Sequence, residues 1–348
     1  MSLAEKRLRV AVIWLGLIGN RHAWAYEHHP RVDLVCVCDQ DSDRARRAAE
    51  RFGCEAETDF GRVAARADLD LVSVCTPDPD HFEPALAMLQ AGHHVLCEKP
   101  LTMQYPQAQR LVDEAASRGL TLSVRLPQRY VGAHQVMHER LASGQLGTFV
   151  TANVRSFIPI SQPTRGFSWV EKTDLHWLYH QHRYDLIRWL TGAEATEVYA
   201  RGQRGVLTSR GIPCLDAVQV LVTYDNGATT LYDTSWINPV NWRRGALQLD
   251  LLYSNGRLAT GGEADPTIVV GEPTSSSARP GIVPDPTMVD GILPRNQWQP
   301  VHDVAAAILA GVAPPVTARD ALAVMAMLTA TDLSLKAGRP VTIAEVAG

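Results

Sequence analysis

Val95-Leu96-Cys97-Glu98-Lys99-Pro100 has the pattern of a buried strand that ends abruptly, because an apolar run leads directly into a Glu-Lys pair. The proline biases Lys99 away from helical backbone and toward extended geometry. In a parallel α/β sheet, the carboxyl ends of the strands face the ligand crevice. We therefore expect Lys99 to face whatever binds at that edge. The alternative is an ordinary surface charge at the end of a strand.

The N-terminal half alternates short apolar runs with segments of helical spacing. The predicted strands are Arg9–Leu15, Asp33–Cys38, Leu71–Cys75, His94–Cys97 and Thr121–Val124. Asp41 can cap the helix that follows the second strand, while Gly53, Gly92 and Gly119 lie where C-terminal helix caps are expected. Because the strands are almost continuously apolar, both faces of the sheet must be covered. The pattern predicts a doubly wound parallel sheet.

The first strand-to-helix turn, Trp14-Leu15-Gly16-Leu17-Ile18-Gly19, is similar to the glycine fingerprint of dinucleotide-binding sites. Trp14 occupies the position of the first glycine, while the second and third glycines remain. Asp39 ends the next strand about twenty residues later, where a carboxylate can accept hydrogen bonds from ribose hydroxyls. Its charge would repel a 2′-phosphate, and Gln40 supplies no compensating cation. NAD is therefore expected as the cofactor in preference to NADP.

The second half has a different pattern and predicts a mostly antiparallel sheet. The expected strands are Phe149–Phe157, Thr196–Arg201, Ala217–Tyr224, Ala228–Trp236 and Leu247–Tyr253. Asp225-Asn226-Gly227 is a hairpin signal between two of them. The stretch Ala264–Pro300 is rich in Pro, Gly and Ser and is expected to be a long loop. We predict a dinucleotide-binding domain over residues 1–124 and an α+β domain with an open sheet over residues 125–348.

With these parts assembled, the chain resembles the Gfo/Idh/MocA family, which includes glucose-fructose oxidoreductase and inositol dehydrogenase. The strongest resemblance runs from Thr76-Pro77 through His81 to Glu98-Lys99-Pro100-Leu101. Arg129-Tyr130 resembles the entry to the family's second domain, and the segment from His182 to Leu190 resembles its catalytic helix. The resemblance covers nearly the whole chain and implies an N-terminal Rossmann domain followed by a substrate-binding and oligomerisation domain.

The resemblance also implies roles for individual residues. Lys99 and His182 would be the catalytic pair. The expected cofactor-binding residues are Gly16, Leu17, Ile18, Gly19, Asp39, Thr76, Pro77, His81, Glu98 and Lys99. The expected substrate-binding residues are Arg129, Tyr179, His180 and Asp185.

Two positions depart from the family pattern. The family helix usually has Asp-x-Gly-x-His-x-x-Asp, and aligning His182 and Asp185 puts Leu178 at the first Asp. Tyr179, His180 or Asp174 could take over the task of that carboxylate. Trp14 is the other departure: its side chain could block the pyrophosphate, or turn away from the cofactor and form part of the cleft wall. We expect the second arrangement.

Histidines and arginines offer further candidates. His176 and His180 lie one helical turn apart, but no third metal ligand is evident, so no metal site is predicted. Several arginines could recognise an acidic or phosphorylated sugar, although for most of them an exposed position at the surface is expected. They are Arg125, Arg129, Arg155, Arg165 and Arg183.

Composition restricts the partners. The 348 residues carry a net charge of −4 with mixed signs, which gives no basic surface for nucleic acid. No stretch is long enough to span a membrane. Lys6, the apolar run after it and Ala23-Trp24-Ala25 imitate a signal peptide, yet its removal would delete the first strand. The six cysteines fit reduced core thiols, so a cytoplasmic protein is expected.

Together these patterns predict a NAD-dependent oxidoreductase that acts on a sugar, cyclitol or related polyhydroxylated compound and forms a homodimer or homotetramer. Two alternatives stay open. One is a NAD-dependent glycosidase that oxidises its sugar transiently. The other is a non-catalytic nucleotide- or sugar-binding regulatory homologue, which Trp14 and Leu178 together motivate.

Overall fold

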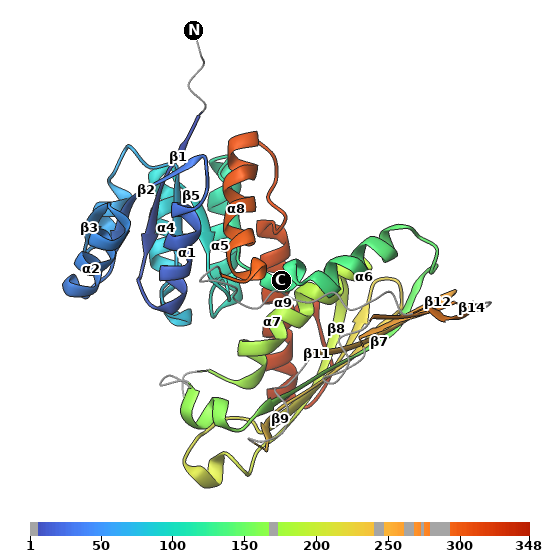
Figure 1. Cartoon of the computed structure of the whole chain (residues 1–348). Coiled ribbons are helices and arrows are strands. Elements are labelled where there is room, and N and C mark those ends of the chain that lie inside the picture. Colours follow the sequence, from blue (N-terminus) through green and yellow to red (C-terminus); the bar gives the residue numbers. More distant parts are fainter. Residues whose placement is uncertain (1–5, 167–172, 240–246, 261–267, 273–274, 279–292) are drawn as a thin grey trace. The chain divides into compact units, whose positions relative to one another are not determined.

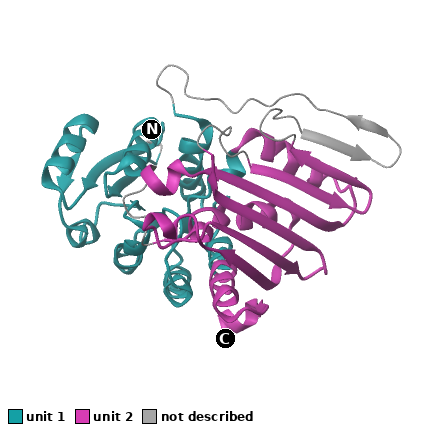
Figure 2. Ribbon diagram, turned by 90° about the horizontal axis from the view of Figure 1, so that it is seen from below, with its two compact units in different colours: residues 1–130, 286–325 teal, residues 131–285, 326–348 magenta. Residues whose placement is uncertain are grey.

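The structure is a computed structural model that describes residues 6–166, 173–239, 247–260, 268–272, 275–278 and 293–348. The chain forms two compact units (Figure 2). The first contains Met1–Tyr130 and Pro286–Met325, and the second contains Val131–Asp285 and Ala326–Gly348. The sequence-based division after residue 124 stays a prediction, but residues 286–325, which it assigned to the second domain, pack within the first unit.

The first unit contains a six-stranded parallel sheet with strand order β3-β2-β1-β4-β5-β6 (Figure 1). The strands are β1 (Leu8–Ile13), β2 (Val32–Cys38), β3 (Glu55–Glu57), β4 (Leu71–Val74), β5 (His94–Cys97) and β6 (Leu122–Val124). The helices are α1 (Leu17–Glu27), α2 (Ser42–Phe52), α3 (Phe60–Ala64), α4 (Phe82–Ala91), α5 (Tyr105–Ser117) and α8 (Arg295–Ala310). Strand β4 and the last four residues of β1 are buried throughout, so side chains cover both faces. The predicted doubly wound fold is confirmed.

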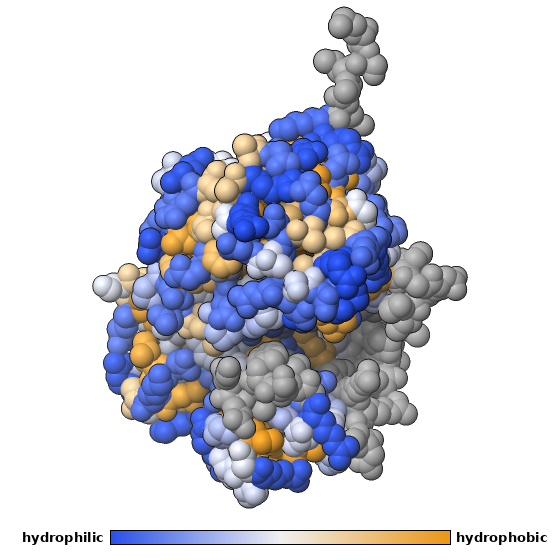
Figure 3. All heavy atoms as spheres, turned by 90° about the vertical axis from the view of Figure 1, so that its left-hand side faces the viewer, coloured by the Kyte–Doolittle hydropathy of each residue, from blue (hydrophilic) through white to orange (hydrophobic). Residues whose placement is uncertain are grey.

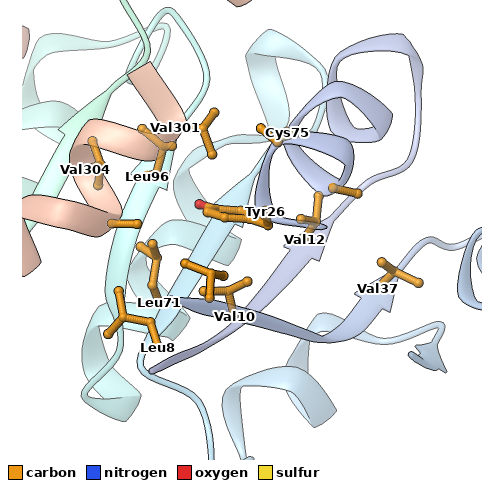
Figure 4. Close-up of a cluster of buried hydrophobic side chains, with 14 of the residues drawn as sticks. Leu8, Val10, Val12, Tyr26, Val37, Leu71, Cys75, Leu96, Val301 and Val304 are labelled. Carbon is orange, nitrogen blue, oxygen red and sulfur yellow. The ribbon is translucent and has the colours of Figure 1, made fainter. Parts of the chain in front are cut away.

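The core of this unit joins residues that are far apart in the sequence (Figure 4). Val12 on β1 and Leu96 on β5 belong to the same buried cluster as Tyr26 on α1. Val301 and Val304 of α8 complete the cluster. Helix α8 packs against α1, while α4 packs against α3 and α5. The C-terminal part of the chain therefore supplies core residues to the N-terminal sheet.

Local signals place the helix ends. The Asp41 side chain accepts a hydrogen bond from the backbone of Arg44 and so caps α2. Gly53 and Gly92 follow α2 and α4 with φ of 65° and 94°, a left-handed conformation that favours glycine. These predicted caps are confirmed. Strand β3, which has three residues and no apolar run, was not predicted.

The second unit contains a nine-stranded sheet with order β14-β13-β12-β11-β7-β10-β9-β8-β15. The first five strands are β7 (Phe149–Pro159), β8 (Ala195–Gln203), β9 (Ala217–Tyr224), β10 (Thr229–Asn238) and β11 (Leu247–Tyr253). The others are β12 (Gly256–Thr260), β13 (Ile268–Glu272), β14 (Ser275–Ala278) and β15 (Val341–Thr342). Among the described strands of this second sheet, only β7 and β10 pair in parallel. The sheet is therefore mostly antiparallel, as predicted. The hairpin at Asp225-Asn226-Gly227 joins β9 and β10.

Helix α7 (Leu175–Thr191) packs against one face of this sheet, and the face that bears Leu221, Leu231 and Leu252 is partly exposed. The other helices are α6 (Gly132–Ala142), the part of α9 (Ala318–Ala337) that follows Met325, and α10 (Ile343–Ala347). Helix α7 contacts β9 and β10. Burial alternates along β9, and Leu221, Leu231 and Leu252 on three different strands are each about two-fifths exposed.

The prediction of one long loop over Ala264–Pro300 needs correction. Strands β13 and β14 lie inside it, and α8 begins at Arg295. Strand β13 pairs with β12 and contains the β-branched run Ile268-Val269-Val270, a strand signal that the prediction overlooked. Strand β14 is Ser-rich and pairs with β13, so backbone hydrogen bonds outweigh its weak local preference. The rest of the predicted loop lies largely outside the described residues.

No helix in the described part of the chain combines the length and apolar character needed to cross a bilayer. On the face in Figure 3, hydrophilic residues cover most of the described surface, and hydrophobic ones are scattered among them.

Candidate cofactor and catalytic sites

The glycine turn lies between β1 and α1, at the carboxyl end of the central strand. Helix α1 begins at Leu17 with Gly16 as its N-cap, two residues earlier than the start near Gly19 expected from the sequence. Leu17, Ile18 and Gly19 therefore form the first turn. Their backbone N–H groups have no partner within the helix, and the positive end of the helix dipole lies there. This turn suits a pyrophosphate group.

The third glycine is required by packing. A Cβ atom at Gly19 would lie 1.8 Å from the backbone oxygen of Trp14, far closer than two such atoms can approach. At Gly16 the nearest atom to a Cβ is the indole nitrogen of Trp14, at 3.4 Å, which is an ordinary contact. Gly19 thus lets α1 approach β1 closely, which is one of the tasks of a glycine in a dinucleotide turn.

Asp39 follows β2 and is only 1 % exposed. Its carboxylate accepts hydrogen bonds from the backbone N–H of Leu15, at 2.8 Å, and of Asp41, at 2.9 Å. The Arg44 side chain forms an ion pair with it, with Nε 3.0 Å from Oδ2. The carboxylate has no exposed side-chain surface in this structure, so a hydrogen bond to a ribose hydroxyl stays a prediction that requires neighbouring side chains to shift. The structure brings Asp39 together with the glycine turn.

A pocket of about 440 Å³ opens beside this carboxylate. Trp14, Asp39, Gln40, Thr76 and Phe82 are among its lining residues. The Trp14 side chain lines the pocket, which agrees with a place in the cleft wall; its orientation relative to a bound cofactor stays a prediction.

The guanidinium of Arg44 lies over the Trp14 ring, 5.3 Å from the ring centroid. Arg44 was not predicted to lie beside Asp39, because it is on the following helix and not next to Asp39 in sequence. The signal was its spacing: Arg44 is in the first turn of α2, which begins next to Asp39.

Trp14 also has an unusual backbone, since it is the only described residue other than glycine with positive φ, at 74°. Replacing Trp14 by glycine would remove this strain, which costs of order 1 kcal/mol, but would add backbone entropy to the unfolded chain. We expect these two effects on stability to offset one another largely. NAD affinity should change by less than about tenfold, because the indole is expected to form part of the cleft wall and not to block the cofactor. Calorimetric titration of NAD into both proteins measures the change. A large gain in affinity for Trp14→Gly would show that the indole obstructs the site.

Thr76 and His81 lie in the loop after β4. The Thr76 hydroxyl donates to the backbone oxygen of Asp80 at 2.9 Å. His81 has no exposed surface, and its ring nitrogens lie 2.6 Å from the Pro100 oxygen and 2.9 Å from the Thr76 oxygen. Thr76 lines the pocket, whereas His81 connects this loop to the Lys99-Pro100 segment. The geometry does not support the predicted direct contact of His81 with a cofactor, because the side chain is enclosed.

Lys99 lies just beyond β5, at the same edge of the parallel sheet as the glycine turn and Asp39. Its side chain is half-buried, whereas the adjacent Glu98 is only 5 % exposed. One Glu98 oxygen lies 3.2 Å from both His22 Nε2 and Arg125 Nη1. Glu98 was predicted to bind the cofactor, but its carboxylate is instead held by side chains of its own unit.

Helix α7 carries the candidate proton-transfer residue in the second unit. The Asp174 side chain caps it, and Gly192 ends it with a left-handed backbone. Tyr179 and His182 are partly exposed and three residues apart, so they are neighbours on one face of the helix. Burial raises the pKa of Tyr179 to about 12, so its hydroxyl stays protonated near neutrality. Lys99 belongs to the first unit and His182 to the second.

Two of the predicted substrate-binding residues are core residues. His180 and Asp185 have no exposed surface. The ring nitrogens of His180 lie 3.1 Å from the Tyr184 hydroxyl and 3.0 Å from the Thr234 hydroxyl. Burial holds the pKa of His180 well below its usual value, so the ring is neutral. Neither side chain is accessible in this structure, so its geometry does not support the predicted substrate contacts of His180 and Asp185, which stay predictions.

The prediction that most of the candidate arginines lie exposed at the surface also needs correction. Arg125, Arg129 and Arg183 are each less than 10 % exposed. Arg129, a predicted substrate ligand, donates to the Pro315 backbone oxygen at 2.6 Å and pairs with Asp320. Its planar fork can hold several groups at once, which suits a buried position.

Arg183 lies below the exposed face of α7. It donates to the Ser156 hydroxyl at 2.7 Å, and its guanidinium lies over the Tyr179 ring. Burial lowers the pKa of Arg183 to about 10. Arg183 thus contacts both the ring and the backbone oxygen of Tyr179. This contact was not predicted from the sequence.

Leu178 is buried, as expected for an apolar residue at the position of the family carboxylate. Asp174 does not replace that carboxylate, since it caps α7 and also pairs with Arg204. Asp332 of α9 supplies another carboxylate at the start of α7, 2.7 Å from His176 Nε2 and 2.9 Å from the Trp177 indole nitrogen. No group of three His, Cys, Asp or Glu side chains suited to a metal ion occurs among the residues that the structure describes.

Comparison with known proteins agrees with this architecture. Residues 8–126 match the model of an oxidoreductase family with an NAD-binding Rossmann fold. Residues 134–259 match the GFO/IDH/MocA C-terminal domain. The two models together cover more than half of the chain. The chain therefore belongs to the Gfo/Idh/MocA oxidoreductase family.

Several relatives have known activities. D-glucoside 3-dehydrogenase of Escherichia coli is 33 % identical over 157 residues, which are 44 % of this chain and 45 % of that enzyme. Inositol 2-dehydrogenase 4 of Saccharopolyspora erythraea is 32 % identical over 209 residues, 58 % of this chain and 59 % of that enzyme. The chain thus spans about half the length of these relatives. An oxidoreductase domain protein from Kribbella flavida has a similar structure, with a TM-score of 0.84, 26 % identity and coverage of 97 % and 99 % of the two chains.

Proposed function

We propose that this protein is a NAD-dependent oxidoreductase that transfers a hydride between the nicotinamide and a CH–OH carbon of a sugar, cyclitol or related polyhydroxylated compound. One observation carries the proposal: the glycine turn, the Asp39 carboxylate and Lys99 lie at the carboxyl edge of one parallel sheet. In open α/β sheets this edge is where ligands bind. The names of the glucoside and inositol dehydrogenases support the substrate class.

The residues fit the cofactor, because α1 begins directly after the glycine turn, without a side-chain cap, and its first-turn N–H groups can bind a pyrophosphate. When bound, NAD accepts or returns the hydride. Lys99 holds the substrate oxygen and stabilises its negative charge. His182 takes the hydroxyl proton in the oxidation direction, a task suited to an imidazole near neutral pH. Tyr179, beside His182 on α7, contacts the substrate.

A screen of sugars and cyclitols with NAD, in which the absorbance of reduced cofactor is followed, tests the proposal. Accumulation of NADH with at least one polyol supports it. Release of an aglycone without net NADH would instead identify the glycosidase. NAD binding without turnover of any compound would favour the regulatory homologue, the alternative motivated by Leu178 and Trp14.

Replacing His182 by alanine should lower kcat for oxidation by roughly 100-fold or more and change KM little, because proton abstraction occurs only in the transition state. Steady-state kinetics with the best substrate of the screen give both constants. A matched control is Trp189→Phe, on the same helix and also partly exposed, which should retain activity. An increase in KM alone would make His182 a binding residue.

Asp39 is expected to determine cofactor choice. Replacing it by alanine removes the ribose acceptor and frees the Arg44 guanidinium, a cation that can pair with a 2′-phosphate. NAD should bind about tenfold more weakly and its advantage over NADP should narrow. Titration of both nucleotides measures this. Adding Arg44→Gln should abolish the relative gain for NADP, whereas a wild-type preference for NADP would contradict the role of Asp39.

The predicted homodimer or homotetramer extends the proposal. Its contact surface would be the open sheet face that bears Leu221, Leu231 and Leu252, since exposed apolar side chains gathered on one face mark interfaces. Leu221 and Leu231 are cross-strand partners, and β7 separates Leu252 from them. Sedimentation equilibrium of the wild type and of Leu231→Glu would decide this, and a wild-type monomer would refute it.

The cysteines form no disulfide and five are buried, which supports the proposed cytoplasmic location.

A further inference from the structure

Glu98 is a buried carboxylate that directly precedes the proposed catalytic lysine. Its Oε1 atom lies 3.2 Å from His22 Nε2 and 3.2 Å from Arg125 Nη1. Its Oε2 atom accepts a hydrogen bond from the backbone N–H of Lys99 at 3.2 Å. The side chain is only 6 % exposed. Both oxygens are thus engaged within the unit, and one of them fixes the backbone from which the Lys99 side chain projects.

The network continues through the core of the first unit. His22 Nδ1 lies 3.1 Å from the Ser73 hydroxyl on β4, and the Tyr26 hydroxyl lies 2.7 Å from the same oxygen. His22 and Tyr26 are on α1, the helix that begins at the glycine turn. Glu98 therefore connects the end of β5 to the interior of α1 and β4.

Arg125 closes the network from the other side. It follows β6, is 5 % exposed, and donates through Nη2 to Gln297 Oε1 at 2.7 Å. Arg21 donates to the same amide oxygen at 3.0 Å. Two arginines therefore face a single carboxylate across this cluster. Without Glu98 their charges would have no acidic partner in the network, and without Arg125 the Glu98 carboxylate would be a poorly compensated buried charge.

The charge states follow from this arrangement. Burial alone would raise the pKa of Glu98, but Arg125 and the hydrogen-bonded His22 outweigh it and hold the pKa well below its usual range. Burial lowers the pKa of His22 despite the neighbouring carboxylate, so the imidazole is neutral near pH 7.

We propose that Glu98 is a positioning residue: its carboxylate, held by His22 and Arg125, fixes the Lys99 backbone and thereby the place of the Lys99 side chain. The proposal rests on the catalytic role given to Lys99 in the proposed function. It assigns Glu98 to the support of Lys99 and not to contact with the cofactor. Arg125 acts one step further away, by stabilising the charge of Glu98.

Three variants separate positioning from simple stability. Glu98→Gln keeps the shape and removes the charge, and kcat should fall about 10- to 100-fold with NAD affinity within about threefold. Arg125→Met leaves the carboxylate poorly compensated and should lower both the melting temperature and kcat. The double variant removes both charges, so we expect it to regain melting temperature relative to Arg125→Met while kcat stays low. Recovery of kcat together with stability would overturn the proposal.

A matched control lies at the opposite end of β5. His93 is buried and its ring nitrogens lie 3.0 Å from the backbone oxygens of Leu69 and Ala64. His93→Gln should lower the melting temperature without a specific loss of kcat, because no proposed catalytic residue lies at that end of the strand. An equal loss of kcat in this control would show that the effect of Glu98→Gln is nonspecific, and would overturn the proposal.

Chemical labelling of Lys99 tests the same inference without any substrate. The chain has four lysines, and peptide mapping after brief treatment with an amine-acylating reagent separates half-buried Lys99 from exposed Lys336. Loss of the charge weakens the hold of His22 and Arg125 on residue 98, so the half-buried Lys99 side chain becomes more accessible to the reagent. At a fixed mildly alkaline pH, Glu98→Gln should therefore raise the labelling of Lys99 relative to Lys336 by about threefold or more. An unchanged ratio would overturn the proposal, even if the polyol screen finds no activity.

Discussion

Replacing Lys99 by methionine is expected to lower kcat by roughly two orders of magnitude or more, because it removes the cation that stabilises negative charge on the substrate oxygen. Methionine keeps an unbranched stem of similar length in a half-buried position, so the fold should persist. NAD affinity should remain within about threefold, since the glycine turn and Asp39 are untouched. Steady-state kinetics and calorimetric titration measure the two quantities.

The control for Lys99→Met is thermal unfolding of both proteins, which should show similar midpoints. Near-normal turnover in a correctly folded variant would remove Lys99 from the mechanism. A loss confined to KM would mean that Lys99 binds the substrate equally in the ground state and in the transition state.

A methyl group at Gly19 should have the largest effect on the fold of the first unit. The Cβ of Gly19→Ala would lie 1.8 Å from the Trp14 backbone oxygen, and neither α1 nor β1 can move without disturbing the core that contains Val12 and Tyr26. We expect the free energy of unfolding to fall by about 3 kcal/mol, at the upper end of the range for overpacked sites. Denaturant titration followed by circular dichroism measures it, with NAD binding lost in parallel.

Gly16→Ala is the matched control in the same turn. Its Cβ would meet only the Trp14 side chain, at 3.4 Å, and Gly16 has a φ of −67° that any residue tolerates. Stability should therefore change by less than about 1 kcal/mol, while NAD binding weakens because a side chain now stands where the pyrophosphate approaches. Equal stability losses for Gly16→Ala and Gly19→Ala would contradict the packing argument.

Much of the first unit could be predicted because its signals are local. Apolar runs identified five of the six strands, and Asp41, Gly53 and Gly92 marked helix ends through their own backbone requirements. Strand β3 was missed because Glu55-Ala56-Glu57 carries no apolar pattern and is a strand only through pairing with β2. Strand β14 was missed for the same reason, whereas β13 was missed although it contains Ile268-Val269-Val270, because the residues around it are rich in Pro, Gly and Ser.

The candidate site divides in the same way. Gly19 and Asp39 could be identified from spacing, because their tasks depend on a turn and a neighbouring strand end. The burial of Arg125, His180 and Asp185 could not be predicted from spacing, because it depends on elements that are distant in sequence. Arg125 meets Gln297 172 positions further along the chain, and His180 meets Thr234 across 54. Periodicity along one helix shows which residues share a face, but not whether another element covers that face.

The contribution of α8 to the first unit has a consequence for synthesis of the chain. Val301, Val304 and Ala305 fill the same core as Val12 and Leu96, and the Ser123 hydroxyl donates to the Val316 backbone oxygen at 2.8 Å. While the ribosome is translating the first 130 residues, the nascent sheet still lacks this covering helix and leaves apolar surface uncovered. The N-terminal sheet must therefore wait for almost the whole chain to emerge before it is complete. A fragment that ends near residue 130 would have the glycine turn but an unfinished interior, which makes it a candidate for chaperone binding.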